Sequence, residues 1–189
     1  MANVDRPSGA RPVNIDGSGF NASLRQYEVK SGTNSNDIFP GDFVAQAADG
    51  SVVPASAGAD NPILGVVTSV EYDNDVAATE YPGYLPSATD GSVLVAMAED
   101  TYFSIQEDSD SSTLAVSDRG DRANFIDNSG SAITGLSKHE IDSSSVGAGA
   151  TGQLQLIRKV ESPDNDYGDK CEWVVQVNLP QTATGTAGV

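Results

Sequence analysis

The segment from Gly41 to Val70 constrains the fold most, because it predicts three short strands separated by turn residues. The pair Asp49-Gly50 lies between two apolar runs, which is a strong local signal for a β-hairpin, since both turn positions favour positive φ. A third strand is predicted over 63–70, with four apolar residues on one face: Leu64, Val66, Val70 and Tyr72. The segment offers no catalytic constellation, so we interpret it as scaffold.

The rest of the chain also favours strands over helices. No window of helical length carries an apolar stripe, whereas the best apolar windows alternate or are short. The clearest strand lies near the C-terminus and places five residues on one face: Cys171, Trp173, Val175, Val177 and Leu179. Nineteen Gly and nine Pro predict many turns. We therefore predict an all-β chain whose body is a β-sandwich or a barrel-like, jelly-roll-type structure, with an extended N-terminal arm and long loops.

Composition divides the chain into three regions. Residues 1–22 are predicted to form the extended arm, residues 23–179 the β-rich body, and residues 180–189 a flexible C-terminal tail. Within the body, the residues from about 107 to 150 are polar and Ser-rich. We interpret them as a loop-rich insertion that holds one or two hairpins.

The predicted arm contains Gly, Pro and Asn and almost no apolar residues, so we do not expect it to pack as an element of its own. Twelve extended residues reach at most ~40 Å, which is enough to leave the parent domain and lie along a neighbouring subunit. Arg6 and Arg11 are its positive charges. We expect a deletion of residues 1–20 to leave the fold intact. The alternative is a frayed terminus.

The net charge of -17 argues against partners that are themselves negative. Such a surface repels DNA phosphates and anionic lipid headgroups, so we expect no direct nucleic-acid role and no membrane role. No stretch approaches the ~20 apolar residues that a membrane span needs, and the N-terminus lacks a signal-peptide pattern. The single cysteine, Cys171, fits synthesis in a reducing cytoplasm and is expected to be buried.

Candidate catalytic residues are few. His139 is the only histidine, and with one cysteine the chain cannot build a His- or Cys-rich metal site. Ser137 and Glu140 flank His139 in sequence, but neighbouring residues of a strand point to opposite faces and do not assemble a triad. A glycosidase would need two acids beside aromatic platforms, for which a single Trp is too little. We predict that the chain is not an enzyme and has no cofactor.

Two acidic groups have oxygen ligands that calcium prefers. The first comprises Asp164, Asp166 and Asp169, but its spacing departs from that of an EF-hand loop. The second comprises Glu107, Asp108 and Asp110. We interpret both as turns rich in Asx residues and predict no metal site. Weak cation binding on the surface, at a symmetry axis, stays open.

A long polar excursion from Glu71 to Gly91 carries Tyr81 and Tyr84. A loop of this length in a compact domain is usually functional or disordered. Tyrosines favour an interface, because a rigid ring with a polar tip contributes contact area at a low entropy cost. Equally, the two rings can simply cover a sheet edge of their own domain.

Several motifs occur in a fixed order along the chain. The first set is Gly41-Asp42 followed by Val44, Asp49-Gly50, Val53-Pro54-Ala55, Ala57-Gly58 and Leu64-Gly65-Val66-Val67. The second set is ANVDRPSGARPV at the start, FSIQED in the middle, then TGLSKHEIDSS and PDNDYG. The first set resembles the core pattern of the head decoration (cement) proteins of tailed phages. The second resembles landmarks of one branch of that group, and together the sets cover most of the chain.

This resemblance implies a structural protein of the virion. Such proteins bind the major capsid protein on the outer surface of the phage head, most often as homotrimers at three-fold or quasi-three-fold positions, and stabilise the shell against internal DNA pressure. It also implies synthesis in the host cytoplasm and an arm that contacts the capsid through five candidate residues: Arg6, Pro7, Arg11, Pro12 and Val13. The alternatives are an acidic β-sandwich that binds carbohydrate or mediates adhesion on a virion surface, and a minor tail or fibre component.

Overall fold

A computed structural model describes residues 3–73, 82–110, 112–147 and 149–182. One sheet contains β1 (Arg11–Val13), β7 (Tyr102–Gln106), β8 (Arg122–Ile126), β9 (Glu140–Asp142), β10 (Leu154–Lys159) and β11 (Glu172–Val177). The other contains β2 (Leu24–Val29), β3 (Phe43–Gln46), β4 (Val52–Pro54), β5 (Gly65–Tyr72) and β6 (Gly91–Met97). The helical segments of the described residues are single 3₁₀ turns, namely η1 (Val116–Asp118), η2 (Ser143–Ser145) and η3 (Gly149–Thr151).

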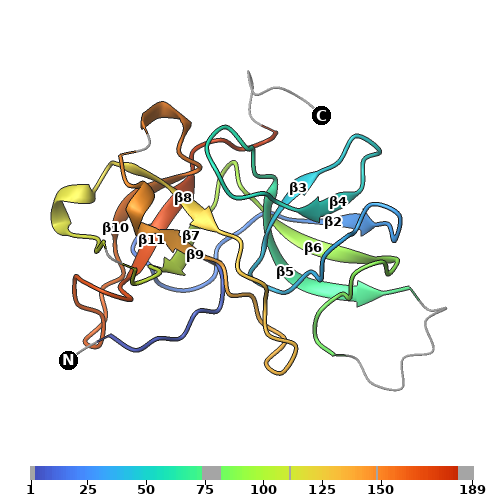
Figure 1. Cartoon of the computed structure of the whole chain (residues 1–189), viewed down its shortest axis with the longest axis horizontal. Helices are drawn as coiled ribbons and strands as arrows, with labels where there is room; N and C mark the ends of the chain where they lie inside the picture. Colours follow the sequence, from blue (N-terminus) through green and yellow to red (C-terminus); the bar gives the residue numbers. More distant parts are fainter. Residues whose placement is uncertain (1–2, 74–81, 111, 148, 183–189) are drawn as a thin grey trace.

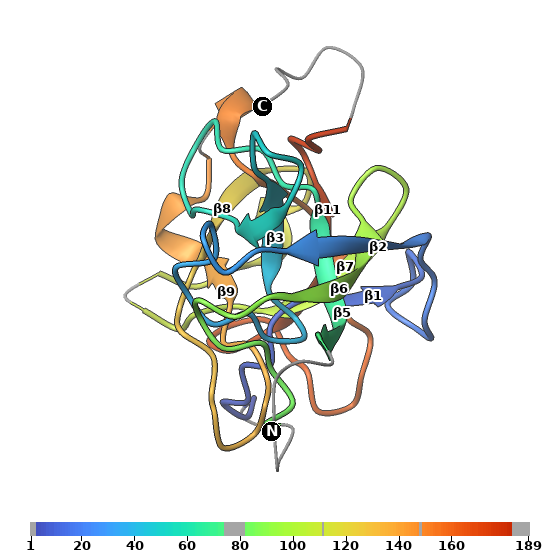
Figure 2. The same cartoon turned by 90° about the vertical axis from the view of Figure 1, so that its right-hand side faces the viewer.

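Both sheets are antiparallel and pack against each other (Figure 1). The strand order is β1-β7-β11-β10-β8-β9 in the six-stranded sheet and β2-β6-β5-β3-β4 in the five-stranded sheet. In Figure 2 the five-stranded sheet lies nearest the viewer, with β2 at its edge. The prediction of an all-β chain is confirmed, and of the two predicted architectures the structure has the sandwich.

The main core lies between the two sheets. Four of the five residues predicted to share a face of the last strand, Cys171, Trp173, Val175 and Val177, are buried in it. Phe43 of the five-stranded sheet reaches across to the other sheet, with its ring centroid 4.8 Å from that of Phe125 on β8. Aromatic rings at such distances add to the stability that burial alone provides.

A second apolar cluster covers the other face of the five-stranded sheet. Its members come from β2, β3, β4, β5 and β6 and from the connections that precede β3, β5 and β6. Two of these connections are joined to each other. Ile38 and Leu85 join these connections through a pair of backbone hydrogen bonds, each 2.8 Å long. The five-stranded sheet is therefore buried on both faces over much of its area, which explains the near-continuous apolar runs of β3, β4 and β6, whereas the edge strand β2 is mostly exposed.

Two details of the Gly41–Val70 prediction need correction. Val66 lies in the core between the sheets, whereas Val70 and Tyr72 contact the outer cluster together with Val67, so the prediction that Val66 shares a face with Val70 and Tyr72 is wrong. The reason is a β-bulge between Val67 and Ser69, because its extra residue shifts the alternation by one.

The hairpin itself is confirmed, since β3 and β4 pair on either side of the predicted turn. Ala47 N donates to Ser51 O at 2.8 Å and Gly50 N donates to Ala47 O at 3.0 Å. Only Gly50 has a positive φ, of 84°, so the turn is a three-residue loop with one left-handed glycine, and not a two-residue loop with positive φ at both positions.

The structure places the beginning of the predicted arm on its own domain. β1 pairs with β7, and Ala10 and Val13 are buried. Ala10 N donates to Gly41 O at 2.9 Å, and the Gln106 side chain holds both Val4 O and Arg6 N, at 2.8 and 2.9 Å. Backbone hydrogen bonds replace the apolar content that the segment lacks. Deleting residues 1–20 would remove a strand, so we no longer expect the fold to survive it unchanged.

The other two predicted regions are also more integrated than expected. Part of the polar stretch at 107–150 forms β8 and β9, which extend the six-stranded sheet to its edge. At the C-terminus, Gln181 N donates to Ile63 O at 2.9 Å, so the predicted tail begins as a docked segment. Residues 183–189 lie outside the described residues.

Candidate functional site

His139 is buried where the two sheets meet. Its Nδ1 accepts a hydrogen bond from Phe43 N at 3.2 Å, so the ring proton lies on Nε2, which faces Asp42 Oδ1 at 3.4 Å. The ring stacks against Phe125, with centroids 5.1 Å apart. Burial lowers the pKa of His139 and raises the pKa of Asp42, and each effect is opposed by the attraction between the two groups.

This group does not have the geometry of a catalytic triad. Ser137 Oγ accepts from His139 N at 3.0 Å, and its hydroxyl stabilises the Asp42 carboxylate. A triad needs the serine hydroxyl on the imidazole nitrogen that the carboxylate does not occupy, but in His139 that nitrogen is taken by Phe43 N. Glu140 lies on β9 and contributes to a different group of acids. We assign Asp42, Ser137 and His139 a structural role.

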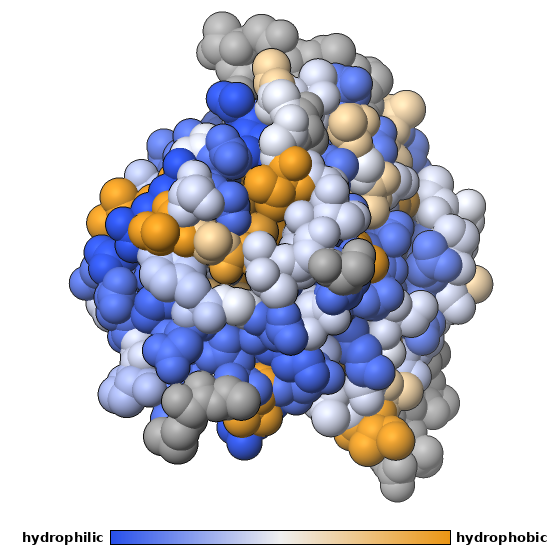
Figure 3. Space-filling view, turned by 60° about the vertical axis from the view of Figure 1, so that its left-hand side comes forward, coloured by the Kyte–Doolittle hydropathy of each residue, from blue (hydrophilic) through white to orange (hydrophobic). Residues whose placement is uncertain are grey.

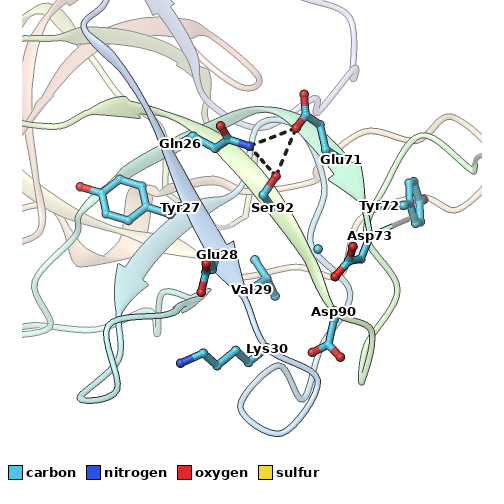
Figure 4. A pocket seen from close by; sticks show the side chains of 11 residues that line it. Gln26, Tyr27, Glu28, Val29, Lys30, Glu71, Tyr72, Asp73, Asp90 and Ser92 are labelled. Atoms are coloured by element: carbon cyan, nitrogen blue, oxygen red, sulfur yellow. Dashed lines mark hydrogen bonds between the residues drawn. The ribbon is translucent and has the colours of Figure 1, made fainter. Parts of the chain in front are cut away.

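A pocket of about 650 Å³ lies on β2, β5 and β6 at the end of the five-stranded sheet (Figure 4). Gln26, Glu71 and Ser92 converge in it: Gln26 Nε2 donates to Glu71 Oε2 at 3.1 Å and to Ser92 Oγ at 2.9 Å, and Ser92 Oγ donates to Glu71 Oε2 at 3.2 Å. Tyr27 and Tyr72 lie at opposite sides of the pocket and do not form a joint aromatic platform. The pocket is a polar surface whose groups bond to each other.

The predicted interface tyrosines are only partly described. Tyr84 is half-buried, and its ring stacks on Phe39 of the same chain, with centroids 4.5 Å apart and planes at 20°. Its carbonyl accepts a hydrogen bond from the Tyr72 hydroxyl. Tyr81 lies outside the described residues. Tyr84 thus covers a part of its own domain in this structure.

The candidate capsid-binding residues divide into two kinds. Pro12 and Val13 are buried and Pro7 is half-buried, whereas Arg6 and Arg11 are exposed. The two arginine side chains are therefore at the surface, whereas Pro12 and Val13 pack β1 against the rest of the domain.

The same part of the chain presents exposed apolar side chains that the sequence did not single out. Val4 and Ile15 are each 54% exposed, Phe20 is 60% exposed and Leu24 is 40% exposed. Half of the large apolar residues exposed in the described part of the chain therefore lie in the first 24 positions. Their signal in the sequence is weak, because each is a single apolar residue among Gly, Asn and Ser.

A carboxylate cluster lies beyond the end of β7. Asp108, Asp110 and Asp142 each have an oxygen within 4.8 Å of the others. Burial, followed by the charges of nearby acids, raises the pKa of Glu107 to about 6 and that of Glu140 to about 7. Glu107, Asp108 and Asp110 could be grouped from the sequence because they are close along the chain. Glu140 and Asp142 could not be added to this group, because they lie on β9, which comes near these acids only through the pairing of the sheet.

The acidic group at Asp164, Asp166 and Asp169 forms a turn, as its Asx content predicts. Asn3 Nδ2 donates to the backbone oxygens of Asp166 and Asp169, each at 2.8 Å, and Asn3 Oδ1 accepts from Asp166 N at 2.8 Å. The carbonyls of this turn are thus engaged by the N-terminal segment, and Asp164 is exposed.

The raised pKa values predict that stability falls as the pH rises. The folded chain retains protons on Glu107 and Glu140 that the unfolded chain, with an ordinary value of 4.5, has released. The contribution of these two groups to the free energy of unfolding is therefore expected to decrease between about pH 5 and pH 7.5 in metal-free buffer. Urea titrations of a Glu140→Gln variant should show a decrease smaller by about 1–2 kcal/mol, allowing for solvent screening of a half-buried group.

The matched control is Glu28→Gln, which removes an exposed carboxylate from the other sheet. It should leave the pH dependence as in the wild type. An unchanged pH dependence in Glu140→Gln would contradict the assignment.

Hydrophilic residues dominate the face seen in Figure 3, and hydrophobic residues appear there in small separate groups. Within the described residues, no helix is long and apolar enough to cross a membrane. Comparisons with protein-family models, with curated proteins and with solved structures found no match.

Proposed function

We propose that the chain is a structural decoration protein that binds the outer surface of a phage head, as a homotrimer at three-fold or quasi-three-fold positions, and stabilises the shell. The observation that carries this proposal is a set of exposed apolar side chains in the first 24 residues, here called the N-terminal surface: Val4, Ile15, Phe20 and Leu24. They belong to a chain of net charge -17 and make up half of the large apolar side chains that are exposed among the described residues. Burying such side chains against a partner protein would stabilise the complex.

The N-terminal surface is suited to a contact made once per subunit. Burying one large apolar side chain contributes about 1.5–3 kcal/mol, so two or three of them give a modest affinity. On a three-fold site three equivalent contacts form together, and the effective concentration for the second and third is high. A trimer therefore holds its place although each contact is weak.

The edge strand β2 continues from the N-terminal surface. It has six residues and begins at Leu24, and among the strands of the described residues it pairs only with β6. A free strand edge can accept a strand from a partner, and main-chain hydrogen bonds then add affinity. The exposed apolar residues and the free edge thus adjoin along the chain.

The shell gains stability by mass action. A protein that binds adjacent capsid subunits in the assembled shell, and not dispersed subunits, shifts the equilibrium toward the intact shell. No catalytic step is needed. The carbohydrate-binding alternative needs an aromatic platform, and the tyrosines drawn in Figure 4 do not supply one, so we do not propose it.

The proposal predicts that an Ile15→Ser/Phe20→Ser variant binds phage heads at least tenfold more weakly than the wild type. Tenfold corresponds to 1.4 kcal/mol, which is less than the burial of one such side chain provides. The measurement is co-sedimentation with heads that lack this protein, prepared from the phage whose genome encodes it. Val116→Ser, at a residue on η1 that is 59% exposed, is the matched control and should bind as the wild type does.

Two further measurements separate the alternatives. Quantitative mass spectrometry of the purified particles should find this chain in numbers comparable with the major capsid protein, and a few copies per particle would indicate a tail or fibre component instead. Light scattering of the purified protein should give the mass of three protomers. Particles that never contain the chain would overturn the proposal.

A further inference from the structure

The carboxylate cluster is assembled by two segments that are distant in the sequence. The loop after β7 supplies Asp108 and Asp110, and the end of β9 supplies Asp142. A bridge between Glu107 and Ile141, together with a hydrogen bond of 3.1 Å from Asp108 N to Ile141 O, fixes one segment against the other. The convergence of the three acids is therefore a property of the sheet and not of one flexible loop.

The hydroxyl of Ser143 lies among these acids and has more acceptors than it can serve. Its Oγ is 2.7 Å from Asp108 Oδ1, 3.1 Å from Asp110 Oδ1 and 3.0 Å from Ser112 O. A hydroxyl donates one proton, so it can serve only one of these three oxygens at a time. Backbone N–H groups also hold the two carboxylates in place, since Ser143 N donates to Asp108 Oδ1 at 3.2 Å and Ser112 N donates to Asp110 Oδ1 at 2.7 Å. A bound cation would add the positive charge that these neutral donors do not supply.

Glu107 provides an independent indication of a ligand. The residue is 0% exposed, and its Oε2 accepts a hydrogen bond from Lys170 N. Its Oε1 is buried and accepts no hydrogen bond from the described residues. The carboxyl lies beside the cluster, since Asp108 repels its charge and the Ser143 hydroxyl stabilises it. A buried carboxylate oxygen without a partner is costly unless a positive charge lies near.

The described Lys, Arg and His side chains do not provide that charge. Their ion pairs join other acids: Lys170 Nζ lies 3.3 Å from Asp5 Oδ2, and His139 Nε2 lies 3.4 Å from Asp42 Oδ1. Within the described part of the chain, the three converging carboxylates and the neighbouring Glu107 therefore have no ion pair with a protein cation.

We propose that Asp108, Asp110 and Asp142 bind a Ca²⁺ ion, with Ser112 O as a further ligand and Glu107 as a fourth carboxylate beside the site. The donors are all oxygens, which hard cations prefer. Two ligands on opposite sides of Ca²⁺ are at most about 5 Å apart, because each lies about 2.3–2.6 Å from the ion. The ligand oxygens, all within 4.8 Å of one another, match this limit. Mg²⁺ needs shorter and more regular coordination, which favours Ca²⁺ here.

The bound ion would tie the loop after β7 to the β9 edge of the six-stranded sheet and offset part of the negative charge. This inference does not depend on the proposed function, because it concerns the folded chain alone.

The test is calorimetric titration of the purified full-length protein with CaCl₂, combined with thermal unfolding in EDTA and in CaCl₂. We expect one Ca²⁺ per chain. At a hundred times the dissociation constant, the melting temperature should rise by about 5–10 °C. An Asp142→Asn variant should lose both the binding and the rise.

The matched control is Asp100→Asn, which removes an exposed carboxylate at the opposite end of β7. It should bind Ca²⁺ as the wild type does. If Asp142→Asn fails to fold, titration of the wild type with MgCl₂ takes its place, and at least tenfold weaker binding is expected. Equal effects of Mg²⁺ and Ca²⁺, an unchanged rise in Asp142→Asn, or no stoichiometric binding to the wild type would each overturn the proposal.

Discussion

A His139→Ala variant is expected to be less stable than the wild type by about 3–5 kcal/mol. The substitution removes a buried ring that stacks on Phe43 and Phe125 and leaves a cavity between the sheets. It also removes the partner of Asp42, a carboxylate that is 3% exposed, and the acceptor of Phe43 N. Removing one partner of a buried polar pair costs more than the pair contributes, because the Asp42 carboxyl group stays buried without its partner.

The loss should be smaller in acid than at neutral pH. The pKa of His139 is lowered in the folded chain, so its contribution to wild-type stability decreases as the pH falls through the ordinary value of 6.5. The pKa of Asp42 is raised by burial and rises further when His139 is removed, so the variant recovers stability once Asp42 is protonated. Urea unfolding at several pH values measures both effects.

The neighbouring Lys138 supplies the control. Its side chain is exposed, and a Lys138→Ala variant should stay within about 0.5 kcal/mol of the wild type at every pH. A His139→Ala variant that loses less than about 1 kcal/mol, or whose loss does not depend on pH, would show that the pair with Asp42 does not hold the sheets together as described.

The parts of the fold that could be predicted from the sequence are those that depend on neighbouring residues. The hairpin at Asp49-Gly50 and the alternation through Trp173 are local patterns, and both are confirmed. The bulge between Val67 and Ser69 was missed, because an extra residue in a strand has no composition of its own. Its consequence, the reversed face of Val66, follows from the period of two.

The carboxylate cluster shows the same limit for the candidate site. Asp108 and Asp110 are close in sequence and could be grouped from it, but Asp142 joins them only through the pairing that brings Ile141 beside Glu107. Neither the strand order nor the Glu107–Ile141 bridge can be deduced from the spacing of residues along the chain. The sequence alone therefore identifies only part of this group of carboxylates.

The N-terminal segment was interpreted as a free arm for a related reason. Low apolar content predicts a segment that gains little by burial, and this is correct for its side chains. Its docking depends instead on backbone groups, on the Gln106 side chain and on a close contact between Gly9 and Gly41. Glycine composition alone does not distinguish a flexible linker from two chains packed backbone to backbone.

This contact leads to the second prediction, that a Gly41→Ala variant loses about 3–4 kcal/mol of stability. The φ of Gly41 is 98°, and a Cβ at this position would lie 2.6 Å from Ser8 O and 3.0 Å from Ser137 Cβ. Both neighbours are held, one as backbone and the other beside buried His139. The methyl group therefore has to displace the segment before β1, which weakens the Ala10 N to Gly41 O hydrogen bond and exposes Val13.

A Gly50→Ala variant is the control that separates the cost of backbone strain at positive φ from the cost of displacing neighbouring atoms. Gly50 has a similar φ of 84° with nothing within 4 Å of the added Cβ, so its variant should lose only about 1 kcal/mol. Hydrogen exchange gives a second measurement, because the amide of Ala10 should lose protection in Gly41→Ala and keep it in Gly50→Ala. Equal losses of stability in the two variants, with Ala10 still protected, would mean that residues 3–13 are not held against Gly41. The segment would then be the free arm that its composition predicts.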